Sequence, residues 1–246
     1  MPEKRRADVL LVERGLAPSR ERAQALILAG EVFLGTDRRV QKAGEQLALD
    51  APLIVRTPDH PYVSRGGVKL QGALDAFAIE PHAAVVADFG ASTGGFSDCL
   101  LQRGAARVYA IDVGRGQLHD RLRRDPRVVA MERVNARHLK AGDLPELVDL
   151  IAIDASFIGL AKLLPAAHEL LRPGGAVLAL VKPQFEVGKD RVGKGGVVRD
   201  EQARSEAIEE AAASARALGF VERGRADSVL AGPAGNRECF LWLEKS

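Results

Sequence analysis

Four charged residues occupy positions where an α/β enzyme could assemble a catalytic cluster. Lys69 lies in SRGGVKL, Asp154 in LIAIDASF, Lys182 in LALVKPQFEVG and Glu238 in GPAGNRECFLW. Asp154 and Lys182 each follow an apolar run typical of a strand, and chemistry in open α/β sheets occurs at the carboxyl ends of strands. A surface charge or a helix cap would explain any one of the four. Four together favour a catalytic site with nearly balanced charge.

Such a cluster suits the activation of a weak hydroxyl nucleophile. Lys182 could accept or steer the hydroxyl proton, and Lys69 could stabilise the developing alkoxide. Asp154 and Glu238 would then orient the two lysines. Placing the nucleophile in line with its target would supply much of the rate, because the reacting atoms must approach within about 3–3.5 Å.

A glycine-rich segment, DFGASTGGF from Asp88 to Phe96, lies between a predicted strand and a predicted helix. Glycines there let the backbone turn tightly and approach a ligand closely. Asp112 follows 22 residues after Gly90, at about the distance where nucleotide-binding folds place a carboxylate against ribose hydroxyls. The loop is not GxGxxG, which argues against a dinucleotide. The alternative is that the glycines only permit strand–helix packing.

The segments around these residues alternate between apolar runs and amphipathic stretches, the pattern of a parallel α/β sheet. We expect strands at 85–88, 108–112, 128–131, 148–154 and 176–181. Further strands at 220–222 and 239–243 could form an antiparallel edge. An Ala/Glu/Arg-rich helix is expected over 200–218.

The N-terminal residues predict a small α+β unit of their own. Apolar residues 9–12 precede a glycine stop at Gly15, and Ser19 is expected to cap a second helix that ends at Gly30. A strand at 31–34 and apolar pieces near Val40 and at 53–55 complete the unit. We therefore divide the chain into a small N-terminal domain (1–57), a linker (58–64) and a larger α/β domain (65–246).

The segment GLAPSRERAQALILAGEVFLG resembles the RNA-binding domain named after ribosomal protein S-four. This resemblance implies that arginines of the paired helices and nearby turns contact RNA phosphates, although solvated surface arginines are the alternative for each. The predicted contacts in this part of the chain are Arg5, Arg6, Arg20, Arg22, Arg38 and Arg39. Beyond it we expect RNA contacts from Arg65 and from a glycine-rich cationic flap at 186–200, which carries Lys189, Arg191 and Lys194.

The glycine-rich loop resembles the first motif of class I methyltransferases, which bind S-adenosylmethionine. The resemblance implies a Rossmann-like fold with a mostly parallel seven-stranded sheet and helices on both faces. It implies that the cofactor's amino-acid end lies against the glycine loop, that Asp112 holds the ribose and that Asn135 contacts the adenine. The implied cofactor-binding residues are Asp88, Gly90, Ser92, Gly94, Gly95, Phe96, Asp112 and Asn135.

The peptides around the four charged residues resemble the Lys-Asp-Lys-Glu tetrad of FtsJ-like ribose 2′-O-methyltransferases. With the N-terminal unit, the whole chain resembles the TlyA (haemolysin A-like) family. That resemblance implies 2′-O-methylation of a cytidine ribose in ribosomal RNA, with rRNA or a ribosomal subunit as partner. Members of that family that act on both subunits tend to carry extra residues at the C-terminus. Because this chain stops soon after Trp242, the large subunit is the expected substrate.

Bulk composition narrows the other possibilities. The chain of 246 residues has a formal net charge of +2 and two cysteines, Cys99 and Cys239. The few cysteines predict a cytoplasmic protein without disulfides or a metal site. The most apolar stretches are far shorter than the roughly 20 residues that span a bilayer, so no membrane segment is expected. Two alternatives stay open: a non-enzymatic RNA-binding or ribosome-assembly factor, and a haemolysin as the family label suggests.

Overall fold

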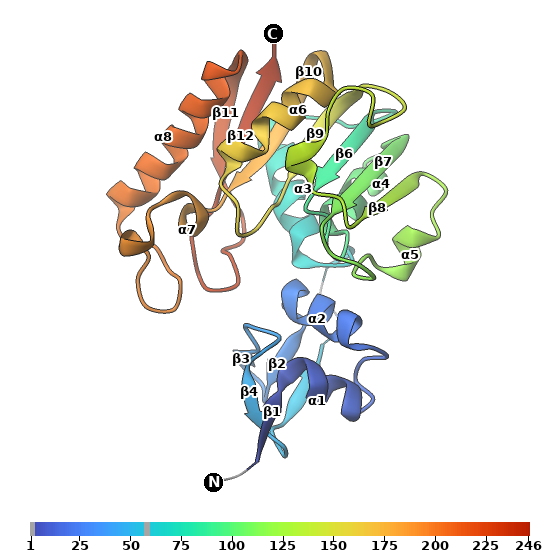
Figure 1. Cartoon of the computed structure of the whole chain (residues 1–246), viewed down its shortest axis with the longest axis vertical. Coiled ribbons are helices and arrows are strands. Elements are labelled where there is room, and N and C mark those ends of the chain that lie inside the picture. Colours follow the sequence, from blue (N-terminus) through green and yellow to red (C-terminus); the bar gives the residue numbers. More distant parts are fainter. Residues whose placement is uncertain (1–2, 57–59) are drawn as a thin grey trace.

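The computed structural model describes residues 3–56 and 60–246, which form a small N-terminal part and a larger sheet-centred part (Figure 1). In the small part a two-stranded sheet pairs β1 with β4, and a three-stranded sheet has the order β3-β2-β5. Its elements are β1 (Lys4–Arg6), α1 (Ala7–Glu13), α2 (Arg20–Ala29), β2 (Val32–Leu34), β3 (Arg38–Arg39), β4 (Gln46–Ala48) and β5 (Leu53–Val55).

Local chemistry defines both ends of α2, the helix that faces the larger part (Figure 1). The Ser19 side chain accepts a hydrogen bond from the backbone N–H of Arg22, as predicted for an N-cap. Gly30 ends the helix in the left-handed conformation, with φ of 76°. Between these ends, Ala23, Leu26 and Ile27 pack into the core of the small part.

The larger part contains a seven-stranded sheet in the order β11-β12-β10-β9-β6-β7-β8. The strands from β10 to β8 are parallel, and β12 runs antiparallel to both β10 and β11. The strands are β6 (Val85–Phe89), β7 (Arg107–Asp112), β8 (Val128–Glu132), β9 (Val148–Ile153), β10 (Leu171–Val181), β11 (Phe220–Asp227) and β12 (Cys239–Lys245).

The helices of this part cover both faces of the sheet. Alternate strand residues enter different cores: Val86 packs with α3 and α4, whereas Ala87 packs with α6 and α8. The α-helices are α3 (Arg65–Phe77), α4 (Gly95–Gln102), α5 (Asp120–Arg123), α6 (Leu164–Leu170), α7 (Pro183–Glu186) and α8 (Glu201–Ala217). Short 3₁₀ helices are η1 (Ala136–His138), η2 (Leu160–Lys162) and η3 (Lys189–Arg191).

The predicted fold class and the two-strand antiparallel edge are confirmed, and the differences concern strand ends. β11 extends to Asp227 because it pairs along the length of β12. β10 begins at Leu171, before the turn-like residues 172–175, which form a register shift against β9. β1 and β4 were not predicted, because their three-residue strands are too short and too polar to show a period.

No helix in the described part of the chain is long and apolar enough to cross a membrane. The linker positions Pro58 and Asp59 lie outside the described residues.

The cap of α2 allows a direct test of the small part's stability. Ser19→Ala removes the acceptor for the Arg22 N–H, so we expect the free energy of unfolding of this part to fall by about 1 kcal/mol. Urea unfolding followed by circular dichroism measures the change. Ser214→Ala is the control, since Ser214 is exposed in α8 and bonds only back to the Glu210 carbonyl. An unchanged unfolding midpoint for Ser19→Ala would contradict the assignment of Ser19 as the cap.

Candidate active site

The candidate site begins at the carboxyl end of β6, where the strand order reverses between β9 and β7. Gly90 follows β6 with φ of +87°, and a Cβ there would lie 2.8 Å from the carbonyl oxygen of Asp154. Gly94 has φ of +92° and immediately precedes α4. The glycines are therefore required by the backbone path, and they keep the loop free of side chains where a ligand would approach.

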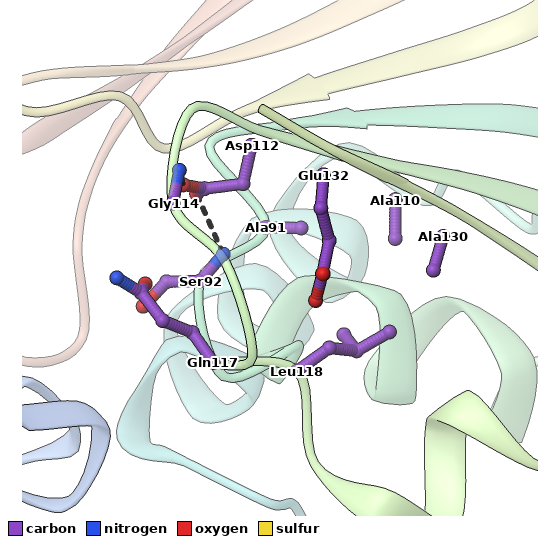
Figure 2. A pocket seen from close by; sticks show the side chains of 9 residues that line it. All are labelled: Ala91, Ser92, Ala110, Asp112, Gly114, Gln117, Leu118, Ala130 and Glu132. Carbon is purple, nitrogen blue, oxygen red and sulfur yellow. Dashed lines mark hydrogen bonds between the residues drawn. The ribbon is translucent and has the colours of Figure 1, made fainter. Parts of the chain in front are cut away.

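Asp112, at the end of β7, holds the glycine loop through its carboxylate. It accepts hydrogen bonds from the backbone N–H of Ser92 at 2.9 Å and of Gly114 at 2.6 Å. Figure 2 shows a small pocket beside it, with the side chains of Asp112, Gln117 and Glu132 around the opening. The residues that line this pocket are Ala91, Ser92, Ala110, Asp112, Gly114, Gln117, Leu118, Ala130 and Glu132.

Asn135, the predicted adenine contact, does not line this pocket. Its side chain accepts a hydrogen bond from the Arg137 N–H at 3.2 Å and caps η1. Glu132 lies in the wall instead and accepts the Gly116 N–H at 2.9 Å. Sequence reasoning missed Glu132 because it is the last residue of β8, with no motif around it. It could have been found as a polar residue at a strand's carboxyl end.

A larger cleft, of about 920 Å³, contains all four predicted catalytic residues. It is lined by residues of both parts of the chain, including Leu28, Ala29 and Lys42 from the small part. Asp88, Gly90, Ser92, Gly95 and Phe96 of the predicted cofactor set line it as well. The four charged residues come from α3, the ends of β9 and β10 and the segment before β12. Four distant peptides thus meet in one cavity.

The four residues form two lysine–carboxylate pairs. Lys69 Nζ lies 2.5 Å from Glu238 Oε2, and these side chains are only 8% and 1% exposed. Lys182 Nζ lies 2.5 Å from Asp154 Oδ1 and also donates to the Ser156 hydroxyl at 3.0 Å. Burial makes an unpaired charge costly, so each carboxylate neutralises its lysine and restricts its orientation. Ser156, two residues after Asp154, was not predicted.

Asp88 is a further carboxyl group at this edge of the sheet. It is fully buried, and one oxygen accepts hydrogen bonds from the Ser97 N–H at 2.9 Å and the Ser97 hydroxyl at 2.6 Å. Burial raises the pKa of Asp88 to about 7, and the nearby carboxyl of Asp154 acts in the same direction. Through its two hydrogen bonds with Ser97, the Asp88 carboxyl holds the start of α4 next to the glycine loop.

The predicted RNA-contacting arginines of the small part are largely held by acidic neighbours. Asp8, a buried residue that the sequence reasoning missed, accepts hydrogen bonds from Arg6 at 2.9 Å and from Arg20 at 3.3 Å. Burial opposes ionisation of Asp8, but the bonds from Arg6, Gln24 and Arg20 hold the pKa of Asp8 well below its usual range. These pairs fix the two guanidinium groups at the surface.

The other predicted RNA contacts divide between surface pairs and the cleft. Arg5 pairs with Glu13 and Arg38 with Glu45, while Arg39 lies over the Phe33 ring at 5.3 Å. Arg22 lies in the first turn of α2, where its backbone N–H donates to the Ser19 cap.

Arg65 and the three flap residues differ in where their side chains lie. Arg65 and Lys194 line the large cleft. Arg191 points to α8, with its guanidinium 2.6 Å from Glu206. The Lys189 side chain lies outside the described residues.

Phe157 stands out because it is 88% exposed and has a positive φ of 66°. Its ring lies 5.1 Å from that of Phe185, centroid to centroid, and both residues line the cleft. Strained backbone in a non-glycine residue persists only where the surroundings hold it. The structure therefore presents an aromatic side chain at the cleft, next to Ser156 and Asp154.

Within residues 3–56 and 60–246, no group of three or more His, Cys, Asp or Glu side chains could hold a metal ion. Cys99 and Cys239 are both buried and free.

Comparison with known proteins decides the family. The family model for FtsJ-like methyltransferases matches residues 62–245. The chain belongs to the FtsJ-like methyltransferases. Among its relatives, the 16S/23S rRNA (cytidine-2′-O)-methyltransferase TlyA of Mycobacterium tuberculosis is 48% identical over 243 residues, covering 99% of this chain and 91% of the relative. This similarity confirms the predicted TlyA-type resemblance.

Two further similarities agree with this family. Hemolysin A of Brachyspira hyodysenteriae is 39% identical over 234 residues, covering 95% of this chain and 97% of the relative. The structure of a hemolysin-type protein from Streptococcus thermophilus superposes with a TM-score of 0.76 at 41% identity, covering 100% of this chain and 90% of that one.

The cofactor of this methyltransferase family is S-adenosylmethionine, and the glycine loop fits it. At Gly90 a side chain would collide with backbone, so the loop stays open to the cleft. The Asp112 carboxylate fixes Ser92 and Gly114 beside a pocket with further polar groups from Gln117 and Glu132. The glycine loop would hold the cofactor's amino-acid end. The pocket formed by Asp112, Gln117 and Glu132 would hold its nucleoside end.

The glycine loop predicts a selective loss of cofactor binding. Gly90→Ala places a Cβ 2.8 Å from the Asp154 carbonyl oxygen at a φ of +87°, so the loop must shift. We expect the affinity for S-adenosylmethionine, measured by calorimetry, to fall at least about tenfold. Gly35→Ala is the matched control: its φ is +64°, and nothing lies within 4 Å of the added Cβ. Equal affinities of the two variants would contradict the assignment of this loop to cofactor binding.

The buried Asp88 predicts a pH-dependent stability difference. Its folded pKa of about 7 lies above the ordinary value of 3.8, so the folded state retains a proton that the unfolded state loses. Its contribution is fully present below about pH 4 and is lost as pH rises through 7, by up to about 1.4 kcal/mol per pH unit. Asp88→Asn should therefore gain stability relative to the unmodified protein as pH rises from about 4 to about 7, with no further gain above that.

Thermal unfolding without cofactor at several pH values measures this gain. The exposed Asp50→Asn is the control for the loss of a carboxylate at the surface. If the stability difference between Asp88→Asn and the unmodified protein did not change with pH, the Asp88 carboxyl would already be ionised in the folded state.

Proposed function

We propose that this methyltransferase transfers the methyl group of S-adenosylmethionine to the 2′-hydroxyl of a cytidine in ribosomal RNA of the large subunit, in the cytoplasm. The observation that carries the proposal is that Lys69–Glu238 and Lys182–Asp154 line one cleft together with the glycine loop. The TlyA relative of M. tuberculosis is named a 16S/23S rRNA (cytidine-2′-O)-methyltransferase, and the similarity spans 99% of this chain.

A ribose hydroxyl must lose its proton, at least in part, before it can attack carbon. When bound, S-adenosylmethionine supplies an electrophilic methyl group on a sulfonium. Lys182 is oriented by Asp154 and Ser156, so its Nζ can accept or direct the hydroxyl proton. The Asp154 side chain lies close to α3: a Cβ added to Gly66 would be 3.7 Å from its Oδ2.

Lys69 has a different role in this proposal. Its Nζ is buried and paired with Glu238, so it presents a fixed positive charge where oxygen develops negative charge. Glu238 compensates that charge in the absence of substrate. The two pairs balance their own charges while placing both lysine Nζ atoms in the cleft.

Recognition of RNA would come from residues around the cleft. We propose residues 1–57 as the RNA-binding domain, 58–64 as the linker and 65–246 as the catalytic domain. Lys42 of the small part and Arg65, Lys194 and Arg199 of the larger part line the same cleft as the catalytic pairs. A ribose can reach Lys182 only with its phosphates attached, and these cations match that charge. The exposed Phe157 ring offers a surface on which an unpaired base can stack.

Methyl transfer to purified ribosomal subunits and naked rRNA tests the proposal. We expect radiolabelled methyl to enter large-subunit rRNA and to survive in an alkali-resistant dinucleotide, as 2′-O-methylation requires. Lys182→Ala should lower the rate by at least about a hundredfold, the usual range for loss of an acid–base group, while cofactor binding remains.

Lys162→Ala, in exposed η2 outside the cleft, is the control and should retain full activity. Label in a base rather than a ribose, or no label on any RNA despite cofactor binding, would refute the proposal. The second result would favour an assembly factor.

A further inference from the structure

The side chain of Asn236 lies two residues before Glu238 and is only 1% exposed. Both of its polar atoms bond to one distant segment. Its Oδ1 accepts the Val198 N–H at 2.9 Å, and its Nδ2 donates to the Gly196 carbonyl at 2.8 Å. A buried amide with both ends satisfied by the same loop holds that loop in one position.

The loop that Asn236 holds is a tight hairpin at 193–197, in the glycine-rich flap. Two backbone bonds close it, from Gly193 N to the Val197 carbonyl and from Gly196 N to the Gly193 carbonyl, each at 3.0 Å. Gly195 and Gly196 have φ of +83° and +80°. A hairpin this short and rich in glycine has little stability of its own, so its placement depends on outside contacts.

The segment that carries Asn236 is in turn tied to the catalytic pair. The Asn236 carbonyl accepts the Gly232 N–H at 2.9 Å, and the Glu238 carbonyl accepts the Ser228 N–H at 2.9 Å. A Cβ on Gly232 would lie 2.5 Å from Glu238 Oε1, so the turn packs directly on the carboxylate. In Figure 1 the loop between α7 and α8 and the loop before β12 extend together toward the small part.

Lys194 is at the turn of this hairpin and lines the cleft with Glu238. The phosphates next to a target ribose lie at a set distance from its 2′-hydroxyl. A cation that binds such a phosphate positions the 2′-hydroxyl only if the distance between the cation and the catalytic pair is also fixed. Asn236 links the hairpin to the catalytic pair, because its side chain bonds the hairpin and it lies two residues before Glu238.

We propose that Asn236 is a positioning residue that fixes the Lys194 hairpin relative to the Lys69–Glu238 pair, so that the hairpin binds a phosphate of the substrate RNA. This proposal rests on the RNA methyltransferase function proposed above. Asn236 acts through the hairpin and need not touch the reacting atoms.

Steady-state methylation of large-subunit rRNA by the full chain tests the role of Asn236. Asn236→Ala should raise KM for RNA about tenfold, leave kcat within about threefold and leave the affinity for S-adenosylmethionine unchanged. Asn236→Asp keeps an acceptor for the Val198 N–H but buries a carboxylate with one oxygen facing the Gly196 carbonyl, so its KM should rise at least as much as that of Asn236→Ala. An unchanged KM in both variants would overturn the proposal.

A double variant distinguishes positioning from direct contact. If Asn236 acts through the hairpin, Lys194→Ala should raise KM in the unmodified protein but add little in the Asn236→Ala background. Fully additive effects would contradict the proposal. Ser228→Ala is the matched control, because Ser228 bonds within the same segment, to the Leu230 carbonyl at 2.8 Å, without contacting the hairpin. A KM effect of Ser228→Ala equal to that of Asn236→Ala would also count against it.

Trypsin digestion without RNA provides a readout independent of methylation. Release of the hairpin should speed cleavage after Lys194 at least about fivefold in both Asn236→Ala and Asn236→Asp, while Ser228→Ala should match the unmodified protein. If the unmodified protein methylates no RNA, the proposed function fails and this digestion still tests the tie. If methylation occurs but cleavage and KM do not change, only the role of Asn236 fails.

Discussion

Two lysines buried at the carboxyl edge of a parallel sheet impose the strongest constraint on this structure. An unpaired ammonium group there would cost several kcal/mol, so each lysine requires a carboxylate in contact. Lys69 meets Glu238, and Lys182 meets Asp154, each at 2.5 Å. The partners of the first pair are 169 residues apart in the chain, so only the completed sheet, with its antiparallel last strand, can bring them together. The catalytic chemistry and the closure of the fold therefore depend on the same contacts.

The glycine loop belongs to the same arrangement. Gly90 passes so close to the Asp154 backbone that no side chain fits between them, which places the cofactor loop against one of the two pairs. Asp88, beneath the loop, stays buried by bonding Ser97 at the start of α4. A methyl donor held by this loop and a hydroxyl held by the lysines would therefore meet at one edge of the sheet. The small part closes the other side of the cleft with Leu28, Ala29 and Lys42.

Much of this could be predicted from the sequence, because it depends on local patterns. Apolar runs located the seven strands, Ser19 and Gly30 marked the ends of α2, and the glycine loop stood out by composition. The four charged residues were recognisable because each lies in a distinctive peptide beside a strand or helix. Exposure and partner choice were not predictable, since they depend on residues far away in sequence. Asp8 gathers Arg6 and Arg20, Asn135 caps η1 rather than lining the pocket, and Asn236 bonds a loop 38–40 residues away.

The central claim is that these two pairs activate a ribose hydroxyl of ribosomal RNA. The most direct measurement is mass spectrometry of nucleosides from large-subunit rRNA that has been incubated with the protein and S-adenosylmethionine carrying a heavy methyl group. We expect the heavy label in 2′-O-methylcytidine alone. Label in a base-methylated nucleoside would contradict it, because neither lysine would then have served a ribose oxygen.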